Sequence, residues 1–309
     1  MLKLMKRPHL ILSCRTFYVT PKNNCEDEPI ERLSCVEEKI GFIGDGNMAK
    51  AIFKGIVNKC LIQPNQVNVS SPYIKNLDVW KEMGACVSTD NAEIMEISDV
   101  VFLAVKPHIL PEAIKNIEKS PHAANIKNKL FLSILAGYKI SKLEKMLSCF
   151  EGARVVRLMP NTPMMVGAGC TAFCPGHGVT EHDLMIVRAI LEATGICHRV
   201  PENIINAVGA LSGGGPAFVY LMIEALSDGG VRMGMHRAMA SKFAAQTVMG
   251  AAKMVLETNK HTGQLKDEVC SAGGTTIAGM HELERGRVRG SIMNAVEASA
   301  KRADQLGGQ

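Results

Sequence analysis

Residues 40–51 read Ile-Gly-Phe-Ile-Gly-Asp-Gly-Asn-Met-Ala-Lys-Ala, and this stretch indicates the fold of the first half of the chain. It predicts an apolar strand over residues 40–43, a glycine turn, and a helix over residues 48–58. Gly44 allows a tight turn, and Gly46 lets a pyrophosphate approach the backbone near the helix start. The turn has the G-x-G-x-x-A pattern of a dinucleotide site, for which an ordinary strand-to-helix turn is the alternative.

The composition is that of a globular protein with room for two domains. The chain has 309 residues, of which 47% are hydrophobic and 21% are charged. One Trp and four Tyr offer few stacking surfaces for single-stranded nucleic acid. The net charge of +5 is not gathered in one basic block, and no uninterrupted apolar run reaches membrane-spanning length. We therefore expect a small-molecule substrate, no nucleic acid and no membrane partner.

The cysteines and acidic residues lack the spacing of a metal site. The ten cysteines include no C-x-x-C pair, and no histidine cluster lies near Cys170 and Cys174. His281, Glu282 and Glu284 do not follow the H-E-x-x-H spacing. We expect no metal and interpret the cysteines as reduced thiols of an intracellular protein.

Residues 1–38 differ in composition from the rest and are expected to form a transit peptide or a disordered linker. Residues 1–25 contain no Asp or Glu but carry five basic residues: Lys3, Lys6, Arg7, Arg15 and Lys22. This composition is typical of a mitochondrial transit peptide and predicts a mitochondrial location. A disordered extension on a cytoplasmic protein is the alternative. The acidic stretch over residues 26–38 is expected to be a solvated linker.

Strands and helices alternate from residue 39 onward. Further strands are predicted at residues 67–70, 85–88, 100–105, 130–135 and 154–158. The run at 100–105 is apolar throughout, as in a parallel strand covered on both faces. We predict an α/β fold with a doubly wound parallel sheet over residues 39–200. Residues 201–309 read as helices rich in Ala, Met and Leu, and they are expected to form an all-helical second domain.

The end of the predicted strand at 67–70 favours NADP(H) over NAD(H). A site selective for NAD usually places a carboxylate there to bind the ribose hydroxyls. This strand runs instead into Ser71 and Pro72, so a serine hydroxyl can meet a 2′-phosphate, with Lys75 as a further contact. A Ser-Pro turn without a ligand is the alternative, and NAD(H) is the alternative cofactor.

Two more loops follow predicted strands at the carboxyl edge of the sheet, where open α/β sheets bind ligands. Their small residues let the backbone reach a nicotinamide or diphosphate, and Lys106 adds a cation unless it is a solvated loop lysine. Asn91 follows a short strand and is expected to face the adenosine. The predicted cofactor-binding residues are Ile43, Gly44, Gly46, Asn47, Met48, Ser71, Asn91, Ala104, Val105, Lys106, Pro107, Ala136 and Gly137.

Motifs in order along residues 39–302 resemble the pyrroline-5-carboxylate reductase family. They are residues 41–49, 102–108 (Phe-Leu-Ala-Val-Lys-Pro-His), 159–163 (Met-Pro-Asn-Thr-Pro), 211–217 (Leu-Ser-Gly-Gly-Gly-Pro-Ala), 263–267 (Gly-Gln-Leu-Lys-Asp) and 271–277 (Ser-Ala-Gly-Gly-Thr-Thr-Ile). The resemblance implies reduction of the cyclic imine Δ1-pyrroline-5-carboxylate to L-proline with NAD(P)H, the last step of proline biosynthesis. It also implies a Rossmann domain followed by a helical substrate-binding and dimerisation domain, in a homodimer that often assembles into decamers.

The family's substrate loop corresponds to residues 271–276. By this resemblance, four residues bind the substrate: Ser271, Gly274, Thr275 and Thr276. The resemblance makes Thr276, whose hydroxyl would reach the ring, and Lys106 the catalytic candidates. Two glycines followed by two threonines at a helix start also offer N–H groups and hydroxyls to an anion. A helix start that merely caps itself has the same sequence.

Three positions depart from the family pattern. Ala272 replaces the usual Pro, Gly214 replaces the usual Ser, and Glu268 replaces the Asn of many animal relatives, which helps to hold the cofactor across the dimer. None of these changes removes an essential group, so activity is expected. A β-hydroxyacid dehydrogenase is an alternative, but it needs a catalytic lysine that the helix from Phe218 lacks in its first turns. A non-catalytic dinucleotide sensor is another alternative.

Overall fold

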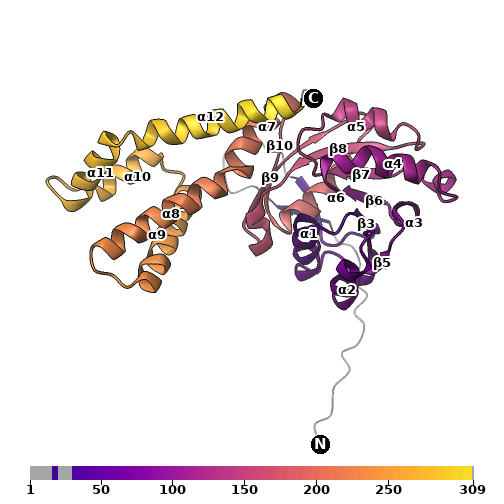
Figure 1. Cartoon of the computed structure of the whole chain (residues 1–309), viewed down its shortest axis with the longest axis horizontal. Coiled ribbons are helices and arrows are strands. Elements are labelled where there is room, and N and C mark those ends of the chain that lie inside the picture. The colour runs from indigo at the N-terminus through magenta and orange to yellow at the C-terminus, as the bar shows by residue number, and fades with distance from the viewer. Residues whose placement is uncertain (1–15, 20–29, 308–309) are drawn as a thin grey trace, which may run out of the picture.

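A layered sheet domain and a helical arm make up the computed structural model, which describes residues 16–19 and 30–307 (Figure 1). The main sheet has the strand order β10-β9-β8-β7-β6-β3-β4-β5. Its strands are β3 (Ile40–Ile43), β4 (Val67–Ser70), β5 (Cys86–Ser88), β6 (Val100–Leu103), β7 (Leu130–Ser133), β8 (Arg154–Met159), β9 (Gly169–Pro175) and β10 (Gly195–Arg199). The strands from β3 to β8 are all parallel, which confirms the predicted doubly wound sheet.

The last two strands run against the other six. β9 pairs antiparallel with β8, and β10 pairs parallel with β9. The sequence does not predict them, because glycine, threonine, cysteine and proline interrupt their apolar character. Only the short 3-10 turn η4 (Thr162–Val166) and a few residues connect β8 to β9. A connection of this length cannot make a crossover to a parallel strand, so β9 returns antiparallel.

Helices cover both faces of the sheet. One face is covered by α1 (Asn47–Asn58), α2 (Ile74–Glu82) and α6 (Glu181–Glu192), and the other by α3 (Asn91–Ile97), α4 (Leu110–Glu118) and α5 (Ile140–Leu147). Successive strand residues alternate between the two cores: Phe42 and Phe102 lie in the first, and Ile43 and Phe131 in the second. The rings of Phe42 and Phe102 stack with centroids 4.7 Å apart. Because both faces are buried, these strands read as continuous apolar runs.

The prediction of a solvated linker before β3 is wrong for residues 30–38. β2 (Ile30–Leu33) pairs antiparallel with β1 (Thr16–Val19) in a separate two-stranded sheet. Val36 is buried in the first core, and its N–H donates to the carbonyl of Leu61 at 2.9 Å. The apolar side chain therefore anchors this segment despite its acidic neighbours. The transit-peptide prediction falls mostly on residues 1–15 and 20–29, which lie outside the described residues.

The helices of the arm extend away from the sheet (Figure 1). They are α8 (Gly215–Arg232), α9 (Arg237–Thr258), α10 (Thr262–Val269), α11 (Thr275–Arg285) and α12 (Val288–Gly307). α8 packs along α9, and α12 returns to α7 (Ile205–Val208) beside the sheet domain. α10 and α11 lie at the far end of the arm.

A chain of polar contacts holds the arm to the sheet. Arg157 on β8 is only 2% exposed, and its guanidinium donates to Glu202 Oε1 at 3.1 Å and Asn206 Oδ1 at 2.9 Å. The side-chain amide of Asn206 donates in turn to Asp304 Oδ1 on α12 at 2.8 Å. Because these contacts join β8, α7 and α12, they fix the direction in which the arm leaves the sheet domain.

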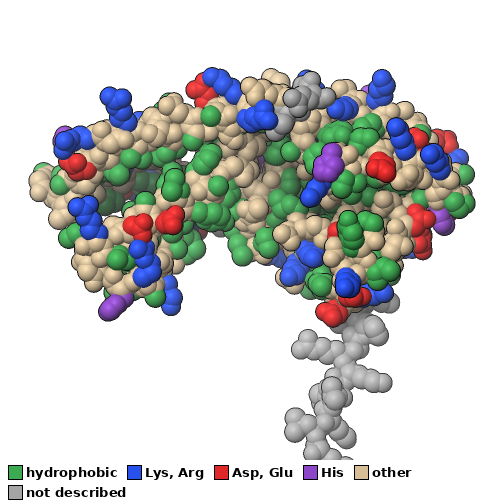
Figure 2. Space-filling view, viewed as in Figure 1, with side chains coloured by type: hydrophobic (Ala, Val, Ile, Leu, Met, Phe, Trp, Pro, Cys, Tyr) green, Lys and Arg blue, Asp and Glu red, His purple; other side chains and the backbone are tan. Residues whose placement is uncertain are grey.

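Large apolar side chains are exposed at many positions along the arm (Figure 2). Tyr220, Leu221 and Phe243 are each more than half exposed in the single chain. An apolar surface of this kind indicates an interaction site. The segment Glu202–Arg232 is also long and apolar enough to cross a membrane by length and composition, and little of it is buried. This qualifies the expectation of no membrane-spanning length, although one such helix is weak evidence for a membrane.

Candidate dinucleotide and substrate site

The carboxyl ends of β3, β4, β6 and β7 lie next to one another and bring the predicted cofactor loops to one edge. Ile43 stands opposite Ser70 of β4 and Leu103 of β6 in the sheet register. The Gly44 N–H donates to the Ser70 carbonyl at 3.0 Å, and the Ala104 N–H donates to the Ile43 carbonyl at 2.9 Å. The glycine turn therefore lies between the loops that follow β4 and β6.

The two glycines of the turn have different structural roles. Gly44 has a φ of +112°, in the left-handed region, and a Cβ there would lie 2.7 Å from the Ala104 carbonyl oxygen. Around Gly46, none of the described atoms lies within 4 Å of a Cβ position, so its backbone faces open space. Gly44 is thus required by the chain itself, whereas Gly46 leaves room for a ligand.

The start of α1 is suited to bind an anion. Gly46 is its N-cap residue, no side chain in the described part of the chain caps it, and its first turn carries no acidic residue. In contrast, α6 starts with a capping box in which Thr180 and Asp183 bind the helix N–H groups. The uncapped N–H groups and the positive end of the α1 dipole fit a pyrophosphate. The residues present therefore fit a dinucleotide.

Ser71 lies at this edge but is fully buried. Its hydroxyl accepts a hydrogen bond from the Tyr73 N–H at 3.2 Å, and none of its surface reaches solvent. A 2′-phosphate could meet this hydroxyl only if the following residues moved, so the contact stays a prediction. Lys75 is exposed in the first turn of α2, and Asn91 is half-buried at the start of α3.

The loops after β6 and β7 also reach this edge. Lys106 and Ala136 are exposed, and within the described residues Lys106 forms no ion pair, so its ammonium group is available to a ligand. Gly137 has a φ of +80°. The Tyr138 hydroxyl donates to the Pro107 carbonyl at 3.0 Å and so joins the two loops. No local pattern in the sequence indicates a role for Tyr138, because its partner lies 31 positions away.

A mostly apolar cavity of about 400 Å³ adjoins the end of β8, the strand next to β7. Asn161, Ser212 and Pro216 are among its lining residues. The Asn161 side chain accepts from the Cys170 N–H at 2.9 Å and donates to the Ser212 carbonyl at 3.0 Å. It thus joins the sheet to the π-helical turn Gly209–Gly213, which precedes α8. A cavity of this size and lining can hold a small ring.

The predicted substrate residues lie on the arm, at the start of α11. Gly274 is the extended N-cap residue, and Thr275 and Thr276 open the helix. No side chain among the described residues caps this helix, and its first turn carries no acidic residue. The threonines therefore do not cap their own helix, and the free N–H groups fit a carboxylate.

Within a single chain, Thr276 and Lys106 lie far apart. α11 lies at the end of the arm farthest from the sheet, whereas Lys106 lies on the sheet edge (Figure 1). The two predicted catalytic residues therefore belong to separate parts of a single chain.

Glu268 on α10 is paired with a lysine. Lys260 Nζ lies 2.8 Å from its Oε1, and Gln264 donates to the same oxygen at 3.1 Å. The hydrogen bond from Lys260 lowers the pKa of the Glu268 carboxyl below its ordinary value. The carboxylate that replaces the expected Asn therefore carries its own counter-charge.

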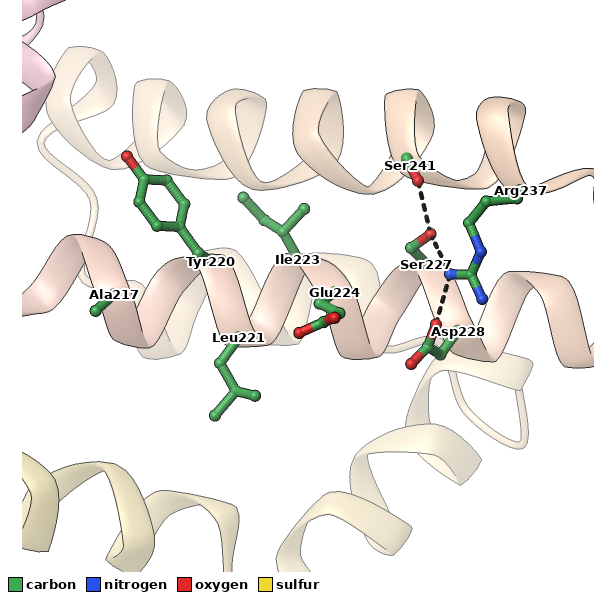
Figure 3. Close-up of a pocket in the computed structure, with 9 residues that line it drawn as sticks. All are labelled: Ala217, Tyr220, Leu221, Ile223, Glu224, Ser227, Asp228, Arg237 and Ser241. Atoms are coloured by element: carbon green, nitrogen blue, oxygen red, sulfur yellow. Dashed lines mark hydrogen bonds and ion pairs between the residues drawn. The ribbon is translucent and has the colours of Figure 1, made fainter.

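An open hollow of about 770 Å³ runs along α8 and α9 (Figure 3). Ala217 and Tyr220 lie at one end, and Leu221 and Ile223 lie near the middle. At the other end, Arg237 donates to Ser227 Oγ at 3.0 Å and pairs with Asp228. The hollow lies on the exposed apolar face of the arm and contains none of the predicted site residues.

Family models match both parts of the chain. Residues 202–306 match the model described as pyrroline-5-carboxylate reductase dimerisation. Residues 39–137 match the model described as NADP oxidoreductase coenzyme F420-dependent.

Curated relatives match over most of their length. Pyrroline-5-carboxylate reductase 3 of Xenopus laevis is 41% identical over 268 residues, which cover 87% of this chain and 96% of the relative. Pyrroline-5-carboxylate reductase of Arabidopsis thaliana is 42% identical over 270 residues, which cover 87% of this chain and 95% of the relative.

Solved structures of similar proteins have the same fold. Pyrroline carboxylate reductase of Plasmodium falciparum, solved with NADP bound, has a TM-score of 0.78 at 34% identity and covers 88% of this chain and 99% of its own. The Coxiella burnetii pyrroline-5-carboxylate reductase has a TM-score of 0.78 at 35% identity, covering 87% of this chain and 98% of its own. Because curated relatives at 41% and 42% identity match this chain over nearly their whole length, the chain belongs to the pyrroline-5-carboxylate reductase family.

Proposed function

We propose that this chain reduces Δ1-pyrroline-5-carboxylate to L-proline with NADPH, and with NADH as the second cofactor. The observation that carries the proposal is a pair of helix starts that have an extended glycine as N-cap residue and no side-chain cap. Gly46 opens α1 at the sheet edge, and Gly274 opens α11 on the arm. One start suits the diphosphate of a dinucleotide, and the other suits the carboxylate of a small substrate. NADPH is favoured because β4 ends without a carboxylate, and a relative is solved with NADP bound.

The chemistry asks the protein mainly to orient two small molecules. A bound reduced nicotinamide supplies the hydride that forms the new bond at the imine carbon. The N–H groups at the start of α11, with Ser271, Gly274 and Thr275, bind the substrate carboxylate. The Thr276 hydroxyl orients the ring nitrogen, which takes a proton from solvent as the C=N bond becomes a C–N bond. Lys106 lies in the loop after β6, which is predicted to reach the nicotinamide or the diphosphate, and it supplies positive charge there.

The active site is shared between two subunits in this proposal. The partner's copy of α11 lies over the dinucleotide edge of the first subunit, because the arm places a chain's own α11 far from that edge (Figure 1). The exposed apolar face of α8 and α9 and the match of residues 202–306 to a dimerisation model support this arrangement. Burial of the segment Glu202–Arg232 against a partner also accounts for its exposed apolar side chains without a membrane.

A larger assembly is a further part of the proposal. Met280, Leu283, Ile292 and Met293 line a groove of about 390 Å³ between α11 and α12, and Met293 is 66% exposed. We expect dimers to pack through such surfaces into a decamer. Light scattering on the purified protein distinguishes a decamer from a free dimer.

Mitochondrial targeting also belongs to the proposal. It rests on the basic, acid-free composition of residues 1–25. Import of the full chain into isolated mitochondria, with a shortened N-terminus afterwards, is the expected result. A chain that stays outside would favour the cytoplasmic alternative.

The activity is tested by mixing purified protein, Δ1-pyrroline-5-carboxylate and NADPH. We expect loss of NADPH absorbance and formation of L-proline. A folded protein that does neither at saturating substrate would refute the proposal. A β-hydroxyacid with NADP+ as the hydride acceptor serves as the comparison, and we expect no oxidation of it because α8 contains no lysine.

A further inference from the structure

Tyr138 joins the two loops that border the predicted nicotinamide site. Its hydroxyl donates to the Pro107 carbonyl at 3.0 Å, directly after Lys106, and its backbone follows Gly137. The last hydrogen bond between β6 and β7 along the sheet is from the Ile134 N–H to the Leu103 carbonyl, at 3.4 Å. Within the described part of the chain, the phenol forms the one hydrogen bond found between these loops beyond that point. The spacing between them therefore depends on this contact.

The phenol ring is held in a fixed position. Tyr138 is 8% exposed and belongs to the core that contains Leu135 and Leu143. Lys142 on α5 places its Nζ 4.8 Å from the ring centroid. With the apolar core on one side and the lysine against the ring, the hydroxyl has little freedom to turn away from Pro107. The donor is thus ordered before any ligand binds.

We infer that Tyr138 is a positioning residue, which sets the width of the groove between Lys106 and the Ala136–Gly137 backbone and so prepares it for NADPH. The inference rests on the proposed function. Without the hydroxyl, Ala104 and Val105 stay packed, but the exposed turn that starts at Lys106 loses its bond to the loop after β7, and cofactor binding must order that turn. The loss therefore reduces cofactor affinity rather than folding.

The variant Tyr138→Phe tests this inference, because it removes one hydroxyl and keeps the packed ring. The Pro107 residue is exposed, so water can satisfy its carbonyl and the variant should fold. Thr194→Val is the matched control. Thr194 is also buried, and its hydroxyl donates to the Leu191 carbonyl at 2.8 Å, but it lies just before β10, at the opposite edge of the sheet from β5. Both variants lose one hydroxyl-to-carbonyl bond.

The measurement is the dissociation constant of NADPH by isothermal titration calorimetry, with melting temperatures in parallel. We expect Tyr138→Phe to bind about fivefold more weakly, which corresponds to about 1 kcal/mol at 1.4 kcal/mol per factor of ten. Thr194→Val should bind as the wild type does, with a similar change in melting temperature.

Equal NADPH affinity in Tyr138→Phe and wild type would overturn the inference, and so would an equal loss in both variants. A wild type that neither binds NADPH nor reduces Δ1-pyrroline-5-carboxylate would overturn the proposed function and this inference with it. A wild type that does both, beside an unaffected Tyr138→Phe, would overturn this inference alone.

Discussion

A Cβ atom on Gly44 would lie 2.7 Å from the carbonyl oxygen of Ala104, so the turn after β3 packs directly against the loop after β6. Two residues further on, a Cβ on Gly46 would meet no described atom within 4 Å. The two glycines of one motif are therefore separable. One is required for folding, and the other for room at the ligand site.

Gly46→Ala should reduce NADPH affinity about tenfold or more and leave folding nearly intact. Its φ of −66° suits alanine, and the added methyl group projects into the space where the pyrophosphate approaches. Reduced entropy of the unfolded chain and the loss of a favoured N-cap residue, each about 1 kcal/mol or less, offset one another. Calorimetry with NADPH and thermal melts measure the two effects.

Gly44→Ala is the contrasting variant and should lower the melting temperature markedly. Unchanged NADPH affinity in Gly46→Ala would contradict the assigned position of the cofactor.

Thr276→Ala should lower kcat about tenfold or more while the NADPH dissociation constant stays the same. Thr276 lies at the uncapped start of α11, where its hydroxyl is assigned to the substrate ring. Steady-state kinetics with both substrates, alongside NADPH binding, separate these quantities. Thr262→Ala is the control, because Thr262 opens the neighbouring helix α10 and is exposed. Equal kinetics in the two variants would remove Thr276 from the site.

Acid should destabilise the sheet domain through Asp183. Burial alone would raise the pKa of this carboxyl, but hydrogen bonds from Arg154 and Thr180 outweigh it and lower the pKa below 3.8. A carboxyl with a lowered folded-state pKa stabilises the fold above its unfolded pKa, and this contribution is lost as the pH falls through the folded value. The free energy of unfolding should therefore decrease as the pH drops below about 4. Urea unfolding at a series of pH values measures it.

Asp183→Asn should weaken the dependence of the free energy of unfolding on pH in acid. It should also lower that free energy by about 3 kcal/mol at neutral pH, because Arg154 loses a buried partner at 2.8 Å. Glu151→Gln is the control, since the pair of Lys127 and Glu151 is exposed and its loss should not be measurable. A pH profile of Asp183→Asn that matches the wild type would show that another group causes the acid sensitivity.

The strands β3, β6 and β7 could be predicted because burial on both faces leaves an apolar run in the sequence, as at Phe102 in β6. β9 could not, because Gly169 and Pro175 at its ends break that pattern. The packing of Val36 under an acidic stretch was also missed, since one apolar residue carries no periodic signal.

The convergence of the predicted cofactor loops at one sheet edge could be predicted because parallel strands place their carboxyl ends together. Gly44, Ala104 and Gly137 each follow a predicted strand, so their shared place could be predicted from the strand ends alone. The separation of Thr276 from that edge did not follow, because it depends on the length and direction of the arm. Contacts such as Arg157 with Asn206 set that direction across 49 residues. The burial of Ser71 was also invisible, because a buried and an exposed serine have the same sequence.

The sharing of the active site between subunits is tested most directly by coexpressing two variants that each impair activity. Gly46→Leu fills the open space at the dinucleotide edge, and Thr276→Ala removes the hydroxyl assigned to the substrate ring. In a shared site, a mixed dimer has one site with both changes and one site with neither. Chains coexpressed in equal amounts should therefore regain about a quarter of the wild-type activity. Activity no higher than that of either variant alone would show that each chain builds its site by itself.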